Sequence, residues 1–154
     1  MGSITFKILG GESLIKKFDS IGAEMTHKIE TAIKSGALIL QNEAKKKTPY
    51  RTGTLRRSIH IETLKKSGSD VEVAVGTDVS YAKSVEFGSG PRIIRPKTKK
   101  ALFWPGAAHP VRLVHHPGTK AHPYLRPALD DNKEKILQEI RTCMRILLQK
   151  GAKR

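Results

Sequence analysis

An apolar repeat near the N-terminus constrains the fold more than any other feature of this sequence. No proline interrupts it before Pro49, and its apolar side chains recur at steps of three or four residues or their multiples: Leu14, Phe18, Ile21, Met25, Ile29, Ile33, Leu40 and Ala44. This period predicts one amphipathic helix of about 35 residues, roughly 50 Å long, with Gly22 and Gly36 as candidate bends. Because such a helix outruns the core of a 154-residue domain, we expect part of its stripe to pack on a neighbouring subunit.

Shorter patterns surround this helix. Alternating apolar residues predict a strand at 4–8 and an antiparallel hairpin from strands at 60–64 and 71–76. Short helices are expected at 55–59, capped by Thr54, and at 81–87, closed by Gly88. Three short strands are expected near 92–95, 101–104 and 110–115, and Pro123 opens a final helix with an apolar face.

These patterns predict an α+β fold, in which a small antiparallel sheet packs with one long N-terminal helix and one C-terminal helix. We expect a single domain over residues 1–154. It divides into an N-terminal strand or arm (1–11), the long helix (12–48), the sheet with basic proline-rich loops (49–122) and the C-terminal helix (123–150).

Positive charge is concentrated in two stretches of the chain. The formal net charge is +15, and residues 44–61 hold six lysines and arginines without an acid, while residues 87–129 hold eight, again without an acid. One interpretation is that lysine keeps solvated loops soluble. The other is a surface for a polyanion or for an acidic protein partner.

Side chains that support catalysis or metal binding are not arranged for it in this sequence. The histidines at 109, 115, 116 and 122 have no helical pair spacing and no carboxylate between residues 87 and 129, so we expect no catalytic residue, metal or cofactor. No apolar run is long enough to span a bilayer, and no membrane partner is expected. Four aromatics (Phe6, Phe18, Phe87, Phe103) lie on apolar patterns, which leaves little to stack on exposed bases.

Three stretches together resemble one protein family. Residues 48–59 (TPYRTGTLRRSI) resemble the P-x-x-T-G-x-L-x-x-S-I signature of tailed-bacteriophage head–tail joining proteins, also called neck, tail-completion or minor tail-component proteins. Residues 75–77 (VGT) with 81–88 (YAKSVEFG) resemble a second block, Y-A-x-x-V-E-F-G. Residues 116–129 (HPGTKAHPYLRPAL) resemble a third, H-P-G-T-x-x-x-P-F-L-x-P-A-L, with Tyr124 in place of the family's phenylalanine.

The resemblance implies a non-enzymatic virion protein that assembles in the host bacterial cytoplasm. It would form a hexameric or dodecameric ring in the head–tail neck, around the DNA channel, and join or complete the tail. Its partners would be copies of itself, the adjacent head-closure or stopper proteins and the tail-terminator or tail-tube proteins, with non-specific contact to genomic DNA. The alternative is a sequence-independent nucleic-acid-binding protein that uses basic stretches 45–57 and 92–126. A histidine-dependent nuclease is a distant third.

The residues that we expect to matter fall into two sets. Candidate subunit or partner contacts are Arg51, Arg56, Arg57, Tyr81, Glu86, Arg92, Arg95, Lys97, Lys99 and Lys100. Structural motif residues are Pro49, Thr52, Gly53, Leu55, Gly88, Pro117, Gly118, Pro123, Leu125 and Pro127. Glu86 is the last acid before the basic segment, so it is expected to pair with Arg56 or Arg57, or to be solvated. Much of the basic surface is expected to contact protein, on acidic faces of adjacent neck or tail rings, because a dense ring of lysines would hold DNA that must slide.

Overall fold

The computed structural model describes residues 4–9, 23–67, 70–97 and 100–151. Helices and antiparallel strands are mixed along the chain, so the predicted α+β class is confirmed. The elements, in order, are β1 (Ile4–Leu9), α2 (Ala23–Lys47), α3 (Thr54–Ser58), β2 (His60–Ser67), β3 (Asp70–Thr77), α4 (Ala82–Phe87), β4 (Arg92–Ile94), β5 (Val114–His116), α5 (Leu125–Asp130) and α6 (Lys133–Gly151).

The larger sheet has the strand order β1-β3-β2, and both pairs are antiparallel. The predicted hairpin is confirmed as β2 and β3, both slightly longer than expected, with a register shift between Thr63 and Lys65. The central strand β3 carries the alternating Val71, Val73 and Val75, all of which are buried. Alternation with a period of two places these three valines on one face, where they meet the helices.

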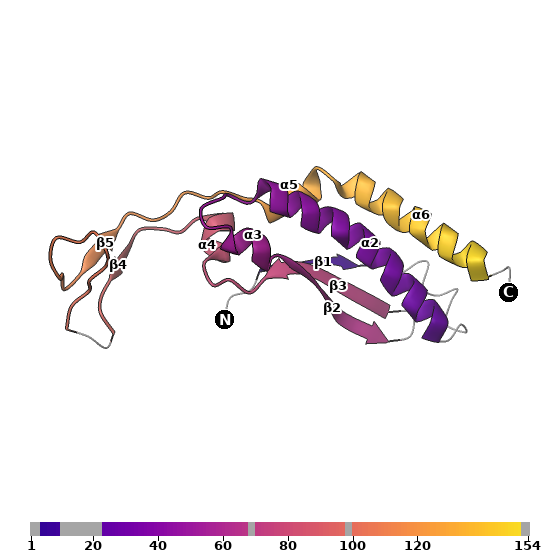
Figure 1. The fold of residues 1–154 in the computed structure, drawn as a ribbon, viewed down its shortest axis with the longest axis horizontal. Coiled ribbons are helices and arrows are strands. Elements are labelled where there is room, and N and C mark those ends of the chain that lie inside the picture. Colours follow the sequence, from indigo (N-terminus) through magenta and orange to yellow (C-terminus); the bar gives the residue numbers. More distant parts are fainter. Residues whose placement is uncertain (1–3, 10–22, 68–69, 98–99, 152–154) are drawn as a thin grey trace.

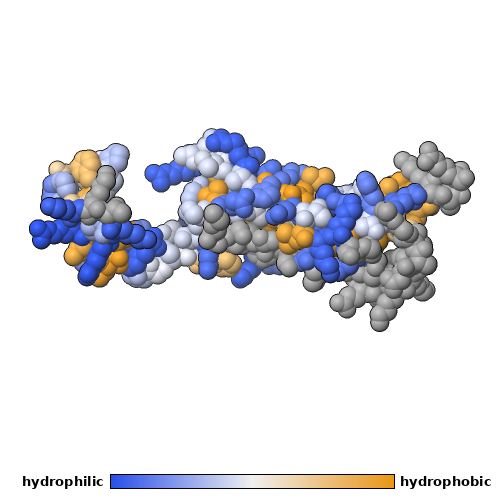
Figure 2. Space-filling view, turned by 90° about the horizontal axis from the view of Figure 1, so that it is seen from below, coloured by the Kyte–Doolittle hydropathy of each residue, from blue (hydrophilic) through white to orange (hydrophobic). Residues whose placement is uncertain are grey.

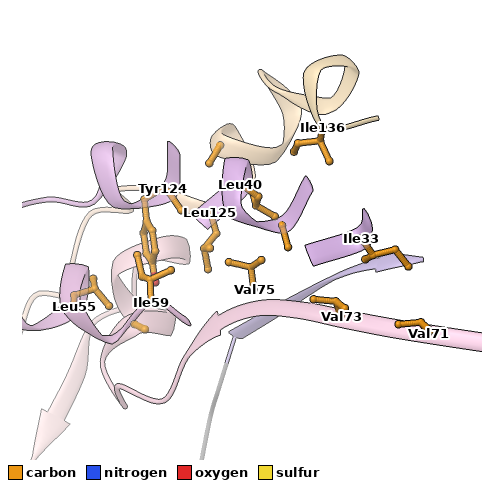
Figure 3. Close-up of a cluster of buried hydrophobic side chains, with 14 residues drawn as sticks. Ile33, Leu40, Leu55, Ile59, Val71, Val73, Val75, Tyr124, Leu125 and Ile136 are labelled. Carbon is orange, nitrogen blue, oxygen red and sulfur yellow. The ribbon is translucent and has the colours of Figure 1, made fainter. Parts of the chain in front are cut away.

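Helix α2 covers this face of the sheet, and α6 runs along the side of α2 away from the sheet (Figure 1). The core lies between these layers, and Figure 3 shows Leu40 of α2, Val75 of β3 and Leu125 of α5 converging there. All three side chains are buried. The three-stranded sheet, α2, α5 and α6 form what we call the body. Burial of apolar side chains between these elements holds the body together.

The apolar stripe of α2 is occupied within its own chain. Met25, Ile33, Leu40 and Ala44 are buried in the single subunit, so these four residues are not the part of the stripe that was expected to pack on a neighbour. The sheet takes one side of the helix, and α5 and α6 take the other, which together bury the stripe. The earlier part of the repeat, residues 12–22, lies outside the described residues, as does the candidate bend at Gly22.

Gly36 lies within α2, which continues through it as a helix, and it packs against α6. A Cβ atom at this position would lie 2.7 Å from Ile140 Cγ1 of α6. The missing side chain therefore allows α6 to lie close to α2. The bend expected at Gly36 stays a prediction.

The C-terminal helix, expected as one element over 123–150, is two helices, α5 and α6. The side-chain amide of Asn132 donates a 3.0 Å hydrogen bond to the Ala128 carbonyl, and the Asn132 carbonyl accepts the first bond of α6 from Ile136 N–H at 2.9 Å. Asn132 thus ends one helix and begins the next. Lys47, at the end of α2, forms a 2.7 Å ion pair with Asp131 at this junction.

Candidate interaction site

Residues 89–122 form an extension that we call the basic arm. It leaves the body next to α4, carries the separate two-stranded sheet β4-β5, and projects away from the layers of the body (Figure 1). Among the described residues of the basic arm, none is buried. An isolated two-stranded hairpin is at best marginally stable in water, so an arm of this kind gains its stability from what it contacts.

The strands of the basic arm follow the predicted pattern only in part. Those expected near 92–95 and 110–115 are present as β4 and β5, although β5 begins at Val114. The strand expected at 101–104 is wrong, since it is reduced to the bridge between Leu102 and Val111, whose backbone hydrogen bonds measure 2.8 and 3.0 Å. Pro105 and Pro110 lie just outside this bridge and lack the amide that would extend it.

The predicted contact residues of the basic arm are exposed. Arg92, Arg95, Lys97 and Lys100 all lie on its surface, and Lys99 lies outside the described residues. No acid occurs in the sequence of the arm to neutralise them. The arm therefore presents uncompensated positive charge at its surface.

Large apolar side chains accompany these charges, and their exposure was not predicted from the sequence. Ile93, Phe103, Trp104 and Leu113 are 53%, 67%, 46% and 43% exposed. Figure 2 shows apolar and hydrophilic side chains side by side on the arm. The expectation that Phe87 and Phe103 lie on apolar patterns and leave little to stack on bases is wrong for both, since they are 48% and 67% exposed. The available signal at Phe103 was two adjacent aromatics in an acid-free, proline-rich loop.

The two ends of the basic arm are hydrogen-bonded to each other where the arm joins the body. We call this junction, at Ser89 and Thr119, the root of the arm. Ser89 and Thr119 exchange two backbone hydrogen bonds, each 2.9 Å long, and His122 N–H donates to the Val85 carbonyl at 2.7 Å. Gly88 and Gly118 both have positive φ, at 74° and 97°. A Cβ at Gly118 would lie 2.4 Å from the Ser89 carbonyl oxygen, so both the dihedral and the close approach require glycine there.

Glu86 anchors the chain where it returns from the arm. Its carboxylate is buried and accepts hydrogen bonds from the backbone N–H groups of Tyr124, Leu125 and Arg126, at 2.7, 3.0 and 2.9 Å. The expected ion pair with Arg56 or Arg57 is therefore wrong, and so is the solvated alternative. The first amides of a helix have no partner within the helix, and a carboxylate satisfies them well because it also complements the positive end of the helix dipole.

Tyr124 places its ring in the core beside Ile59 (Figure 3). Its hydroxyl oxygen is buried and has no hydrogen-bond partner among the described residues. Burial, followed by the nearby Glu86 carboxylate, raises the pKa of this hydroxyl above its ordinary value. At the same position the resembling family block carries phenylalanine, which has no hydroxyl to satisfy.

A groove of about 410 Å³ lies on the body next to the root. Phe87, which is 48% exposed, Pro123 and Pro127 give it an apolar surface, and Asp130 and Asp131 add carboxylates. The guanidinium of Arg126 lies 5.5 Å from the centre of the Phe87 ring. Clefts of roughly 300 Å³ or more accommodate small ligands, so this groove has room for a few side chains.

A second hollow, of about 480 Å³, brings together the first two sequence blocks. Predicted residues of both blocks line it: Pro49, Arg51, Thr52, Gly53, Leu55 and Tyr81. Gly53 precedes α3 with φ of 73°, and Leu55 is buried beneath it. Gly53, and not Thr54, occupies the N-cap of α3, so the predicted cap is wrong. Arg56 and Arg57 are exposed on α3.

Part of the first basic stretch is neutralised within the subunit. Lys46 pairs with Glu43 at 2.7 Å, and Lys47 pairs with Asp131. The hydrogen bond from Lys46 lowers the pKa of the Glu43 carboxyl below its ordinary value. The positive charge of the basic arm is therefore less neutralised within the subunit than that of the first basic stretch.

The histidines of the basic arm are distributed along it. His116 Nδ1 accepts a 3.0 Å hydrogen bond from Gly118 N–H, so its ring supports the root. Within the described ranges, no three His, Cys, Asp or Glu side chains are grouped so that they could hold a metal ion. Across those same ranges, no helix combines the length and apolar character needed to cross a membrane.

The remaining predicted residues lie at or near the root. Pro117 and Pro123 are exposed, Leu125 is buried, and Pro127 is half-buried within α5. The structure thus brings the second and third sequence blocks together through Glu86 and Gly88. The first block lies beside Tyr81 and Val85 of the second.

Comparison with known proteins places the chain in a family. No curated protein and no solved structure matches the chain. Residues 12–88, half of the chain, match the family model described as "Bacteriophage HK97-gp10, putative tail-component". The matched region contains the first two sequence blocks and ends at Gly88, where the basic arm begins. The chain belongs to the HK97-gp10-like family of tailed-bacteriophage head–tail joining and tail proteins.

Proposed function

We propose that this protein is a non-enzymatic structural subunit that forms a ring in the head–tail neck, around the DNA channel, and joins or completes the tail. Family membership supports the class of tail component. The single observation that carries the finer proposal is the basic arm, which holds exposed apolar and basic side chains but no buried described residue. Such an arm is suited to contacts between molecules.

The asymmetry of the subunit favours a ring over a two-fold dimer. The arm and the body present different surfaces, so an arm that contacts the next body makes a head-to-tail interface. Head-to-tail interfaces generate rings when the rotation between subunits closes. Hexameric or dodecameric rings are the expected orders, with the adjacent head-closure or stopper and tail-terminator or tail-tube proteins as further partners.

Much of the basic surface is proposed to contact protein. DNA has to slide through the channel during packaging and ejection, and a dense set of lysines facing the lumen would retain it. Acidic faces of neighbouring rings or copies would satisfy the same charges without this cost. Assembly in the host cytoplasm and location in the virion neck follow from the same proposal.

The test is a phage carrying a nonsense mutation in this gene. We expect DNA-filled heads and separate tails to accumulate, and joining to be restored by the wild-type protein supplied from a plasmid. A protein in which residues 91–117 are replaced by a short Gly-Ser linker should keep the circular dichroism spectrum of the body yet fail to restore joining. Normal virions without the gene product, or full rescue by the armless protein, would contradict the proposal.

A sequence-independent DNA-binding function is the second candidate, and the uncompensated charge of the basic arm favours it. Retardation of duplex DNA at about 150 mM salt measures it directly. Tight binding with a steep salt dependence, reflecting about six or more phosphates, would support this function over the neck ring. Binding that is weak at this salt concentration supports a protein-contacting arm.

A further inference from the structure

We propose that the tip of the basic arm of one subunit docks in the groove beside the root of a second copy of this chain. The proposal rests on the ring of the proposed function and names the contact that builds it. By the tip we mean the loop between β4 and β5, centred on Phe103 and Trp104. The partner is the groove of Phe87, Pro123, Pro127, Asp130 and Asp131.

The tip has the chemistry of a docking element. Phe103 and Trp104 are 67% and 46% exposed and are flanked by the exposed cations Lys100 and Arg112. Buried aromatic and arginine side chains contribute most of the binding free energy in many interfaces. Leaving two large aromatic rings in water is unfavourable, and both rings remain largely exposed on the arm.

The groove offers the complementary surface. Its apolar wall comes from Phe87 and the two prolines, and carboxylates lie at its edge. Asp130 is exposed and forms no ion pair with another described residue, whereas Asp131 is paired with Lys47. Arg126 also lines the groove, so an incoming arm meets two exposed carboxylates and one cation there. Because the arm contains cations without acids, the arm of another subunit offers Asp130 an attractive partner.

The geometry favours contact between molecules over contact within one molecule. The tip lies at the far end of the arm from the root beside which the groove is formed (Figure 1). Fifteen residues separate Ser89 from Trp104, which allows a reach of at most roughly 50 Å. A compact body of about 120 residues has a radius of gyration of roughly 14 Å, so the tip can reach the groove of an adjacent subunit.

The first test is site-specific photo-crosslinking at the tip. The protein carries Phe103→p-benzoylphenylalanine and is co-expressed with the adjacent neck and tail proteins, as a mixture of ¹⁴N- and ¹⁵N-labelled chains. We expect a crosslinked dimer of mixed isotope composition, with the second site in peptides covering residues 121–131. The matched control is Tyr50→p-benzoylphenylalanine, which places the same probe on a 76% exposed aromatic position of the body. This control should not crosslink to the groove.

Charge exchange is the second test. Lys100→Glu with Arg112→Glu, or Asp130→Lys alone, should reduce the mixed-isotope dimer about tenfold, because like charges then meet at the groove. A protein that carries both the arm and the groove substitutions should form the mixed-isotope dimer again. Glu139→Lys reverses an exposed acid of α6 and should leave the dimer unchanged.

The outcomes separate this inference from the proposed function. A ring seen by electron microscopy, with tip crosslinks to another part of the copy, to a different virion protein or to DNA, would overturn the docking and leave the ring intact. A crosslink within one chain would also overturn it. A protein that stays monomeric in the presence of its neck partners would overturn the ring itself.

Discussion

Replacing Glu86 by alanine tests the anchor of the basic arm. The substitution removes one carboxylate that accepts three backbone hydrogen bonds, from Tyr124, Leu125 and Arg126. Helix α5 would then begin in the interior with unpaired amides. The position is 2% exposed, so water cannot readily replace the lost acceptor.

The expected magnitude follows from the burial of the donors. The bonds from Tyr124 and Leu125 are buried, and each unsatisfied buried donor costs about 1–3 kcal/mol. We therefore expect Glu86→Ala to lower the free energy of unfolding by roughly 2–6 kcal/mol. This is a large share of the 5–15 kcal/mol typical of a whole domain.

Glu86→Gln separates hydrogen bonding from simple loss of the side chain. One carboxylate oxygen accepts from Tyr124 and Leu125, and the other accepts from Arg126. Glutamine can keep its oxygen on the first pair and turn its NH₂ group toward Arg126 N–H, which loses one bond. We expect a smaller loss, about 1–3 kcal/mol.

Urea unfolding followed by circular dichroism provides the measurement, with hydrogen exchange at residues 124–126 as a local readout. Glu139→Ala, at an exposed acid of α6, is the matched control and should change stability by less than about 0.5 kcal/mol. If Glu86→Ala were as stable as this control, the capping argument would be refuted. The same holds if glutamine were as damaging as alanine. Should the alanine protein fail to fold, the glutamine protein still carries the comparison.

Three further substitutions test other parts of the structure. Gly118→Ala should cost more than the roughly 1–2 kcal/mol of a left-handed residue with a Cβ, because the added Cβ would also lie 2.4 Å from the Ser89 carbonyl oxygen. Hydrogen exchange should then be faster at the root amides, whereas Gly90→Ala, whose Cβ meets no atom within 4 Å, should show no change. Tyr124→Phe should leave the midpoint of urea unfolding unchanged or raise it, since the buried hydroxyl has no partner among the described residues, and a loss above about 1 kcal/mol would contradict this. Hydrogen bonds from Lys34 and then Lys66 lower the pKa of Glu30 from 4.5 to about 2. The stability that Glu30 adds is therefore present above pH 4.5 and is lost as the pH falls toward 2. Glu30→Gln should therefore reduce the fall in unfolding free energy between pH 4.5 and 2, measured by urea unfolding. An unchanged fall would contradict the assignment.

The parts of the fold that the sequence predicted are those set by local periodicity. The repeat through Ile33 and Leu40 predicted α2, and the alternation of Val71, Val73 and Val75 predicted the central strand, because each pattern places its side chains on one face. The break between α5 and α6 was missed, although Asn132 is a residue type that commonly caps helices.

The candidate site was predicted less well because its contacts are long-range. Glu86 caps amides 38 to 40 residues further along the chain, and no local pattern connects them. The exposure of Phe103 depends on the whole segment having no core, which the hydropathy of one short window does not reveal. The stripe of α2 looked available to a neighbour because the position of α6 could not be predicted from either helix alone.

Because the two ends of the basic arm pair at the root, changes in the arm beyond the root should have little effect on the melting temperature of the protein. Its two ends are fixed by Ser89 and Thr119, and none of its described residues enters the core. Loop-closure entropy grows slowly with length, so the segment beyond the root can be lengthened or replaced with little change in melting temperature. Under the proposed function, a heat-stability screen would therefore not detect arm variants that fail to join heads to tails.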